Sequence, residues 1–206
     1  MSQLQPINPA IGCFAQFTNP NQETKLIIKE KVMSITGDAF DIKLDPQNGQ
    51  PPHPVFKVDP SWITSRKSFH DVNGNHLFDV KKEHFHLVHN YFKAVDPNGT
   101  KFFEVKSGFS LVGSKATATF TSAAGGKEET LVMKGNWRDS TADIVDETRN
   151  AVVARITRKS MFKSFTTFAT GQNEYGLTVA PGVDFALMAA LCVCFDELNN
   201  ESTAAA

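Results

Sequence analysis

The segment GVDFALMAALCVCFDEL, residues 182–198, decides the fold of this chain. Its residues 185–195 form an uninterrupted apolar run, confined by Asp184 on one side and by Asp196 and Glu197 on the other. A membrane-spanning helix needs about 20 apolar residues, whereas a run of about 10–14 is typical of a buried helix. We therefore predict a buried helix near residues 183–198 and no transmembrane span.

The predicted helix has distinct ends and no polar face. Because it is apolar on every side, it must be surrounded by other elements. Pro181 and Gly182 interrupt the preceding segment, and Asp184 suits the N-cap position. Asp196 and Glu197 lie where the helix dipole disfavours negative charge, so we expect the helix to emerge into solvent there.

Short β-rich runs alternate with turn signals along the rest of the chain. Asn-Gly and Gly-Gly dipeptides tolerate the positive φ angles of tight hairpin turns. Turns are predicted at residues 45–49, 73–74, 96–99, 125–126 and 149–150, and a last pair of strands at residues 164–169 and 175–181. With a first strand at residues 25–32, the count reaches about twelve strands.

Several of these runs alternate between apolar and polar residues. Val152, Ala154 and Ile156 fall on one face, with Arg155 and Thr157 on the other. This period of two is typical of antiparallel strands with one buried side. A barrel of about twelve strands is wide enough to hold a helix. We predict a mainly β fold: a closed antiparallel β-barrel of about twelve strands that encloses the hydrophobic C-terminal helix.

Composition narrows the possible functions. Lys plus Arg (21) and Asp plus Glu (22) nearly cancel, so no nucleic-acid partner is expected. The odd cysteine count argues against a secreted disulfide scaffold. Cys192 and Cys194 would point roughly 200° apart on a helix, so we expect small buried side chains and no shared metal. Without a recognisable signal peptide, we expect a cytoplasmic protein that is peripheral to a membrane at most. We also expect it to be a monomer.

Five stretches resemble the LURP-one-related family, which belongs to the tubby C-terminal-like superfamily together with the phospholipid scramblases. They are TGDAFDIK (36–43), PVFKVD (54–59), DVNGNHLF (71–78), VVARITRK (152–159) and LTVAPGVDFALMAALCVCFDELN (177–199). The resemblance implies one barrel domain over residues 25–199, preceded by a partly irregular extension (1–24) and followed by a disordered tail (200–206). It also implies a closed twelve-stranded barrel around a central helix.

The resemblance implies less about function. Plant members are associated with pathogen defence, tubby proteins bind phosphoinositides through basic surface residues, and scramblases associate with membranes. No tubby-type lipid motif matches here position by position. The Pro-rich arm and cysteine cluster of the scramblases are missing from this chain as well.

The best candidate site is the basic segment ARITRKSMFKSF, residues 154–165. It contains Arg155, Arg158, Lys159 and Lys163, interleaved with Met161, Phe162 and Phe165. Near an anionic membrane each cation contributes about 1 kcal/mol of attraction. The alternative interpretation is a polar outer face with phenylalanines in the core.

Two other patterns invite metal chemistry but do not fit it. His84 and His86 of HFHLVH would share one face of a strand, whereas His89 would point the other way. The segment after Asp71 begins like a calcium loop but has His76 where such a loop needs Gly. The chain also lacks nucleotide-binding and nucleophile-elbow motifs. We predict no metal, no cofactor and no catalytic residues.

Three functions remain open from the sequence. The first is a non-enzymatic module that binds an anionic phospholipid, such as a phosphoinositide, or a protein partner in signalling, stress or defence. The second is a scramblase-like membrane protein, in which the closing helix would enter the bilayer. The third is an uncharacterised enzyme, or a binder of a small ligand, at the mouth of the barrel.

Overall fold

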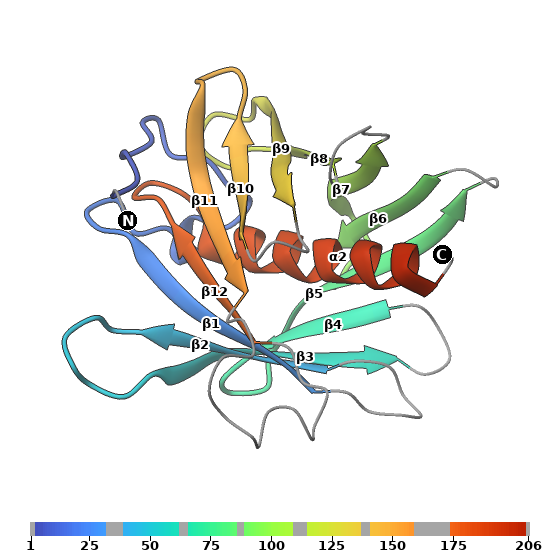
Figure 1. The fold of residues 1–206 in the computed structure, drawn as a ribbon, viewed down its shortest axis with the longest axis horizontal. Coiled ribbons are helices and arrows are strands. Elements are labelled where there is room, and N and C mark those ends of the chain that lie inside the picture. Colours follow the sequence, from blue (N-terminus) through green and yellow to red (C-terminus); the bar gives the residue numbers. More distant parts are fainter. Residues whose placement is uncertain are drawn as a thin grey trace.

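Twelve strands and one long helix make up the computed structural model, which describes residues 3–31, 39–61, 66–85, 89–108, 115–136, 141–158 and 174–204 (Figure 1). The strands are β1 (Thr24–Lys31), β2 (Ala39–Asp45), β3 (His53–Ser61), β4 (Arg66–Asp71), β5 (His76–Phe85), β6 (His89–Val95), β7 (Lys101–Gly108), β8 (Lys115–Thr121), β9 (Glu128–Asn136), β10 (Thr141–Asp146), β11 (Ala151–Arg158) and β12 (Glu174–Val179). A short 3-10 helix, η1 (Ala15–Phe17), precedes them, and α2 (Phe185–Ala204) follows.

The sheet closes on itself. Each strand pairs antiparallel with its neighbour in the sequence, and β1 pairs with β12, for example at Leu26 opposite Leu177. The predicted closed antiparallel barrel is therefore confirmed. All five predicted turns join paired strands. Of the last predicted strand pair, residues 175–181 overlap β12, which ends at Val179, whereas residues 164–169 lie outside the described residues.

Helix α2 lies inside the barrel, with β9–β11 above it and β3 and β4 below it in Figure 1. Every residue from Ala186 to Asp196 is at most 1% exposed. Inward-facing phenylalanines and aliphatic residues of the strands pack around it, and together they form one continuous core. Cys192 and Cys194 are buried in this core as free thiols, as predicted.

The N-terminal segment closes the barrel end at which α2 begins. Ile7 donates its N–H to the Pro181 carbonyl (2.8 Å), and Ile11 donates to the Gly182 carbonyl (3.0 Å). The strand pairs β2–β3, β4–β5, β6–β7, β8–β9 and β10–β11 all turn at this same end, because their connections alternate between the two ends of an antiparallel barrel. Residues 3–23 are thus an integral part of the fold.

Asp184 fixes the start of α2. Its Oδ1 accepts the N–H groups of Ala186 (2.8 Å) and Leu187 (3.1 Å), as the predicted N-cap requires. Its Oδ2 accepts those of Cys13 (3.0 Å) and Phe14 (2.8 Å), which ties the N-terminal segment to the helix. Burial raises the pKa of this carboxyl to about 6, although its four backbone donors favour the charged form.

The opposite end of α2 differs from the expectation. Asp196 is 1% exposed and accepts a hydrogen bond from the Tyr175 hydroxyl, and Glu197 pairs with Lys67 Nζ at 2.9 Å. Asp196 is therefore still inside the barrel, and the helix becomes partly exposed from Glu197 onward. Tyr175 and Lys67 offset the unfavourable interaction of the two acids with the helix dipole. The helix also continues to Ala204, beyond the predicted end near residue 198.

Candidate functional site

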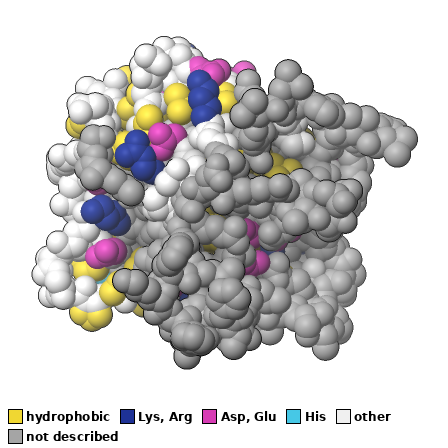
Figure 2. Space-filling model, in the orientation of Figure 1, with side chains coloured by type: hydrophobic (Ala, Val, Ile, Leu, Met, Phe, Trp, Pro, Cys, Tyr) yellow, Lys and Arg dark blue, Asp and Glu magenta, His cyan; other side chains and the backbone are white. Residues whose placement is uncertain are grey.

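Only part of the predicted basic site lies in the described structure. Arg155 lies on the outer side of β11, where its Nε is 2.8 Å from Asp143 Oδ1. This hydrogen bond raises the pKa of the guanidinium and balances its charge. Arg158 is the last residue of β11, and its side chain is not described; Lys159 and Lys163 lie outside the described residues. On the described part of the face in Figure 2, cationic side chains lie next to acidic ones.

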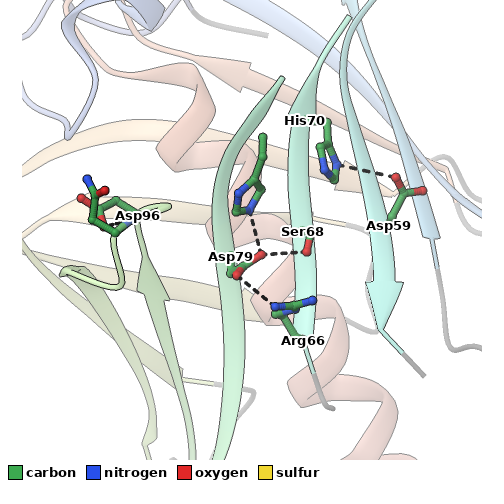
Figure 3. Close-up of polar contacts among 8 residues, drawn as sticks. Asp59, Arg66, Ser68, His70, Asp79 and Asp96 are labelled. Carbon is green, nitrogen blue, oxygen red and sulfur yellow. Dashed lines mark hydrogen bonds and ion pairs between the residues drawn. The ribbon is translucent and has the colours of Figure 1, made fainter. Parts of the chain in front are cut away.

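A second polar region lies on the outer face of β4 and β5 (Figure 3). Its centre is Asp79, a buried residue of β5. Asp79 Oδ1 accepts a hydrogen bond from Ser68 Oγ (2.7 Å) and lies 2.9 Å from His76 Nε2. Its Oδ2 lies 3.5 Å from Arg66 Nη1. We call these four residues the Asp79 cluster.

His70 connects this cluster to its neighbours on both sides. It lies opposite His76 in the β4–β5 pair, with ring centroids 5.4 Å apart. Toward β3, its Nδ1 lies 3.6 Å from Asp59 Oδ2, which is too long for a hydrogen bond. This Nδ1 is buried and has no hydrogen-bond partner among the described residues.

A groove of about 760 Å³ opens beside His70, toward the hairpin turns of β2–β3 and β4–β5. We call it the outer groove. This volume lies within the range of about 300–1,000 Å³ that is usual for small-ligand sites. Its lining comprises Asp41, Ile42, Lys43, Pro54, Phe56, Lys57, Asp59, His70, Asp71, Val72 and Gly74.

Two β-bulges flank the outer groove. The β2–β3 register shifts between Ile42 and Lys43, and the β4–β5 register shifts between Phe69 and His70. Bulges bend a strand and redirect its side chains, so they account for a recess on an otherwise continuous sheet.

The sequence interpretation missed this region, although one signal was present. His70 and His76 flank the Asn73-Gly74 turn, so a hairpin centred on that turn brings them together across β4 and β5.

Within the Asp79 cluster, the serine hydroxyl contacts a carboxylate. Ser68 donates its hydroxyl proton to the Asp79 carboxylate rather than to an imidazole, so these described residues do not form a Ser–His pair. Among the three histidines of HFHLVH, His86 lies outside the described residues, and the side chains of His84 and His89 are not described. Within the described part of the chain, no group of three His, Cys, Asp or Glu residues could hold a metal ion.

The fold defines a class of protein: a closed antiparallel barrel built around a buried helix. A family model described as LURP-one-related matches residues 24–196. The chain belongs to the LURP-one-related family. The family match begins at Thr24, so the N-terminal segment that closes the barrel precedes it.

Two relatives from Arabidopsis thaliana are similar over part of the chain. Protein LURP-one-related 15 is 33% identical over 35% of this chain, and Protein LURP-one-related 10 is 31% identical over 34% of it. The aligned stretches span 32% and 35% of those two proteins. No solved structure matches the chain. Among the described residues, no helix is sufficiently long and apolar to cross a bilayer.

Proposed function

We propose that this protein is a non-enzymatic module that binds anionic phospholipid at a membrane surface, as a peripheral cytoplasmic protein. The observation that carries the proposal is the position of α2. Since the helix and its surrounding side chains fill the barrel, a ligand is bound on the outer surface. Membership of the LURP-one-related family assigns no reaction to the chain.

The basic segment at the end of β11 is the proposed contact with the membrane. Residues 155–163 contain four cations and no acid, with Met161 and Phe162 between them. Clustered cations attract an anionic leaflet, and apolar side chains among them favour the interface. Arg155 is paired with Asp143, which balances its charge. Most of this attraction therefore comes from the other three cations, Arg158, Lys159 and Lys163.

Sedimentation with vesicles tests this proposal. We expect binding to phosphatidylcholine vesicles that contain phosphatidylinositol phosphates at low ionic strength, and weaker binding as salt screens the charges. Combined Arg158→Ala, Lys159→Ala and Lys163→Ala substitutions remove about 3 kcal/mol of attraction. Arg155→Ala alone has a smaller effect.

A matched control replaces three other exposed lysines, Lys101, Lys106 and Lys134, by Ala. This control lowers net charge by the same amount and is expected to retain most of the binding. Equal losses in the two triple variants, or no binding of the wild type at low salt, would reject the proposal. Binding only to a protein partner would also reject it.

A further inference from the structure

Three Asn-Gly pairs lie in hairpin turns at the barrel end where α2 begins. They are Asn48-Gly49 between β2 and β3, Asn73-Gly74 between β4 and β5, and Asn98-Gly99 between β6 and β7. All six residues are exposed, and the three glycines have nearly the same φ, between 82° and 85°. The pairs therefore share their residue types, their exposure and the φ of their glycines, and they differ in their hydrogen bonds.

An Asn-Gly pair can react with itself without an enzyme. The backbone nitrogen of glycine, after losing its proton to a base in the solvent, attacks the side-chain Cγ of the asparagine. A bond from this nitrogen to Cγ closes a five-membered succinimide ring, the bond from Cγ to Nδ2 breaks, and ammonia leaves with a proton taken from water. Water then opens the ring to aspartate or isoaspartate. Glycine favours the attack because it carries no side chain beside the nitrogen.

The backbone nitrogen of Gly49 differs from its two counterparts in its hydrogen bonds. Gly74 donates its N–H to the Asp71 carbonyl (3.1 Å), and Gly99 donates its N–H to the Asp96 carbonyl (2.9 Å). Among the described residues, the N–H of Gly49 meets no acceptor. A hydrogen bond that holds an N–H makes its proton harder to remove, so Gly49 offers the most available nucleophile of the three.

The side chain of Asn48 is also the best prepared for attack. Its Oδ1 accepts the N–H of Gln50 at 3.1 Å. By contrast, the side chains of Asn73 and Asn98 form no hydrogen bond within the described part of the chain. The contact with Gln50 holds the amide against the backbone that follows it, and it places a donor at the oxygen that gains negative charge during the attack.

The turn around Asn48 is held less firmly than the other two. In the β4–β5 turn the Asp71 carboxylate accepts two backbone N–H groups (2.8 and 2.9 Å), and in the β6–β7 turn the Asp96 carboxylate does the same (2.9 and 2.8 Å). The matching Asp45 of the β2–β3 turn accepts one such group (2.9 Å) from the described residues. The β2–β3 connection is also the longest of the three, at residues 46–52. It therefore reaches the geometry of ring closure with a smaller loss of hydrogen bonds.

We propose that Asn48 is a site of spontaneous deamidation, and that the fold protects Asn73 and Asn98 from the same reaction. The product is aspartate or isoaspartate, and either one adds a negative charge to the β2–β3 turn, toward which the outer groove opens. Isoaspartate also lengthens the main chain of this turn by one carbon atom. The modification does not depend on the proposed membrane contact of the basic segment.

Peptide mapping by mass spectrometry tests this site on the full, folded chain. During incubation at mildly alkaline pH, we expect Asn48 to be converted several-fold faster than Asn73 or Asn98. The rate should rise with pH, because the attacking nitrogen must lose its proton. In urea the three pairs should react at similar rates, since unfolding removes the hydrogen bonds that distinguish them. No conversion of Asn48, equal rates in the folded chain, or the same difference in urea would overturn the proposal.

Three substitutions make the test specific. Asn48→Gln should abolish the acidic form that isoelectric focusing detects, because glutamine must close a larger ring, whereas the matched Asn73→Gln should leave this form in place. Asp71→Ala removes the acceptor that holds the β4–β5 turn, so it should speed the conversion of Asn73 several-fold and leave that of Asn48 unchanged. An acidic form that persists in Asn48→Gln, or an unchanged rate at Asn73 in Asp71→Ala, would contradict the proposed protection by the fold.

Discussion

Gly182 is the residue on which the junction between β12 and α2 depends. Its φ of 82° lies in the left-handed region, and a Cβ there would come within 2.1 Å of the Ile7 carbonyl oxygen. That oxygen belongs to the backbone of the N-terminal segment, so it cannot move aside without opening the barrel end. Gly74 has the same φ of 82° in the β4–β5 turn, but a Cβ there would meet nothing within 4 Å.

The two glycines form a matched pair for mutagenesis. We expect Gly74→Ala to lower the free energy of unfolding by about 1 kcal/mol, the cost of the backbone conformation alone. Gly182→Ala should cost about 3 kcal/mol or more, because it adds a clash with backbone. Urea denaturation of both variants measures this difference. Similar losses would show that the N-terminal segment does not close on Gly182 as described.

Single residues also show where sequence alternation gave the wrong side-chain direction. The pattern predicted Val152 on the same buried face as Ala154. Instead Val153 is fully buried and Val152 is partly exposed, since the β10–β11 register shifts between Ile144 and Val145. One extra residue in a strand reverses the faces that follow it. Alternation cannot locate such a bulge, because both valines suit either face.

Among the elements, α2 was the most predictable and its C-terminal end the least. Its apolar run, its N-cap at Asp184 and its burial followed from local sequence. The surroundings of Asp196 and Glu197 did not follow from local sequence. Tyr175 of β12 contacts Asp196, and Lys67 of β4 pairs with Glu197. A rule based on the helix dipole describes an isolated helix and contains no information about residues distant in the chain.

The buried Tyr175–Asp196 contact should contribute measurably to stability. We expect Tyr175→Phe to lower the free energy of unfolding by about 2 kcal/mol, since it removes a donor from a buried carboxylate. The control is Tyr91→Phe, which removes a hydroxyl bonded to the partly exposed Glu104 at 2.8 Å and should cost about 1 kcal/mol or less. Thermal or urea unfolding compares them. An equal cost would mean that the end of α2 is open to water.

At the scale of the whole molecule, turn signals were sufficient for the topology. Short turns at regular intervals leave little choice but a meander, and closure follows from the need to enclose α2. The outer groove depends instead on two bulges and on His70 facing His76 across β4 and β5, so the sequence interpretation did not find it. The role of residues 3–23 was also hidden, since they carry no regular pattern.

The central claim is that α2 is the core on which the barrel closes, and native-state hydrogen exchange tests it most directly. Because opening the helix would expose the whole core, its amides should exchange only by global unfolding. We predict that the amides of residues 188–195 exchange with the same free energy as those of Leu26 and Ile28 in β1, with or without anionic vesicles. Helix amides that exchange with a free energy lower by about 3 kcal/mol or more would contradict the account, since α2 would then leave a barrel that stays folded.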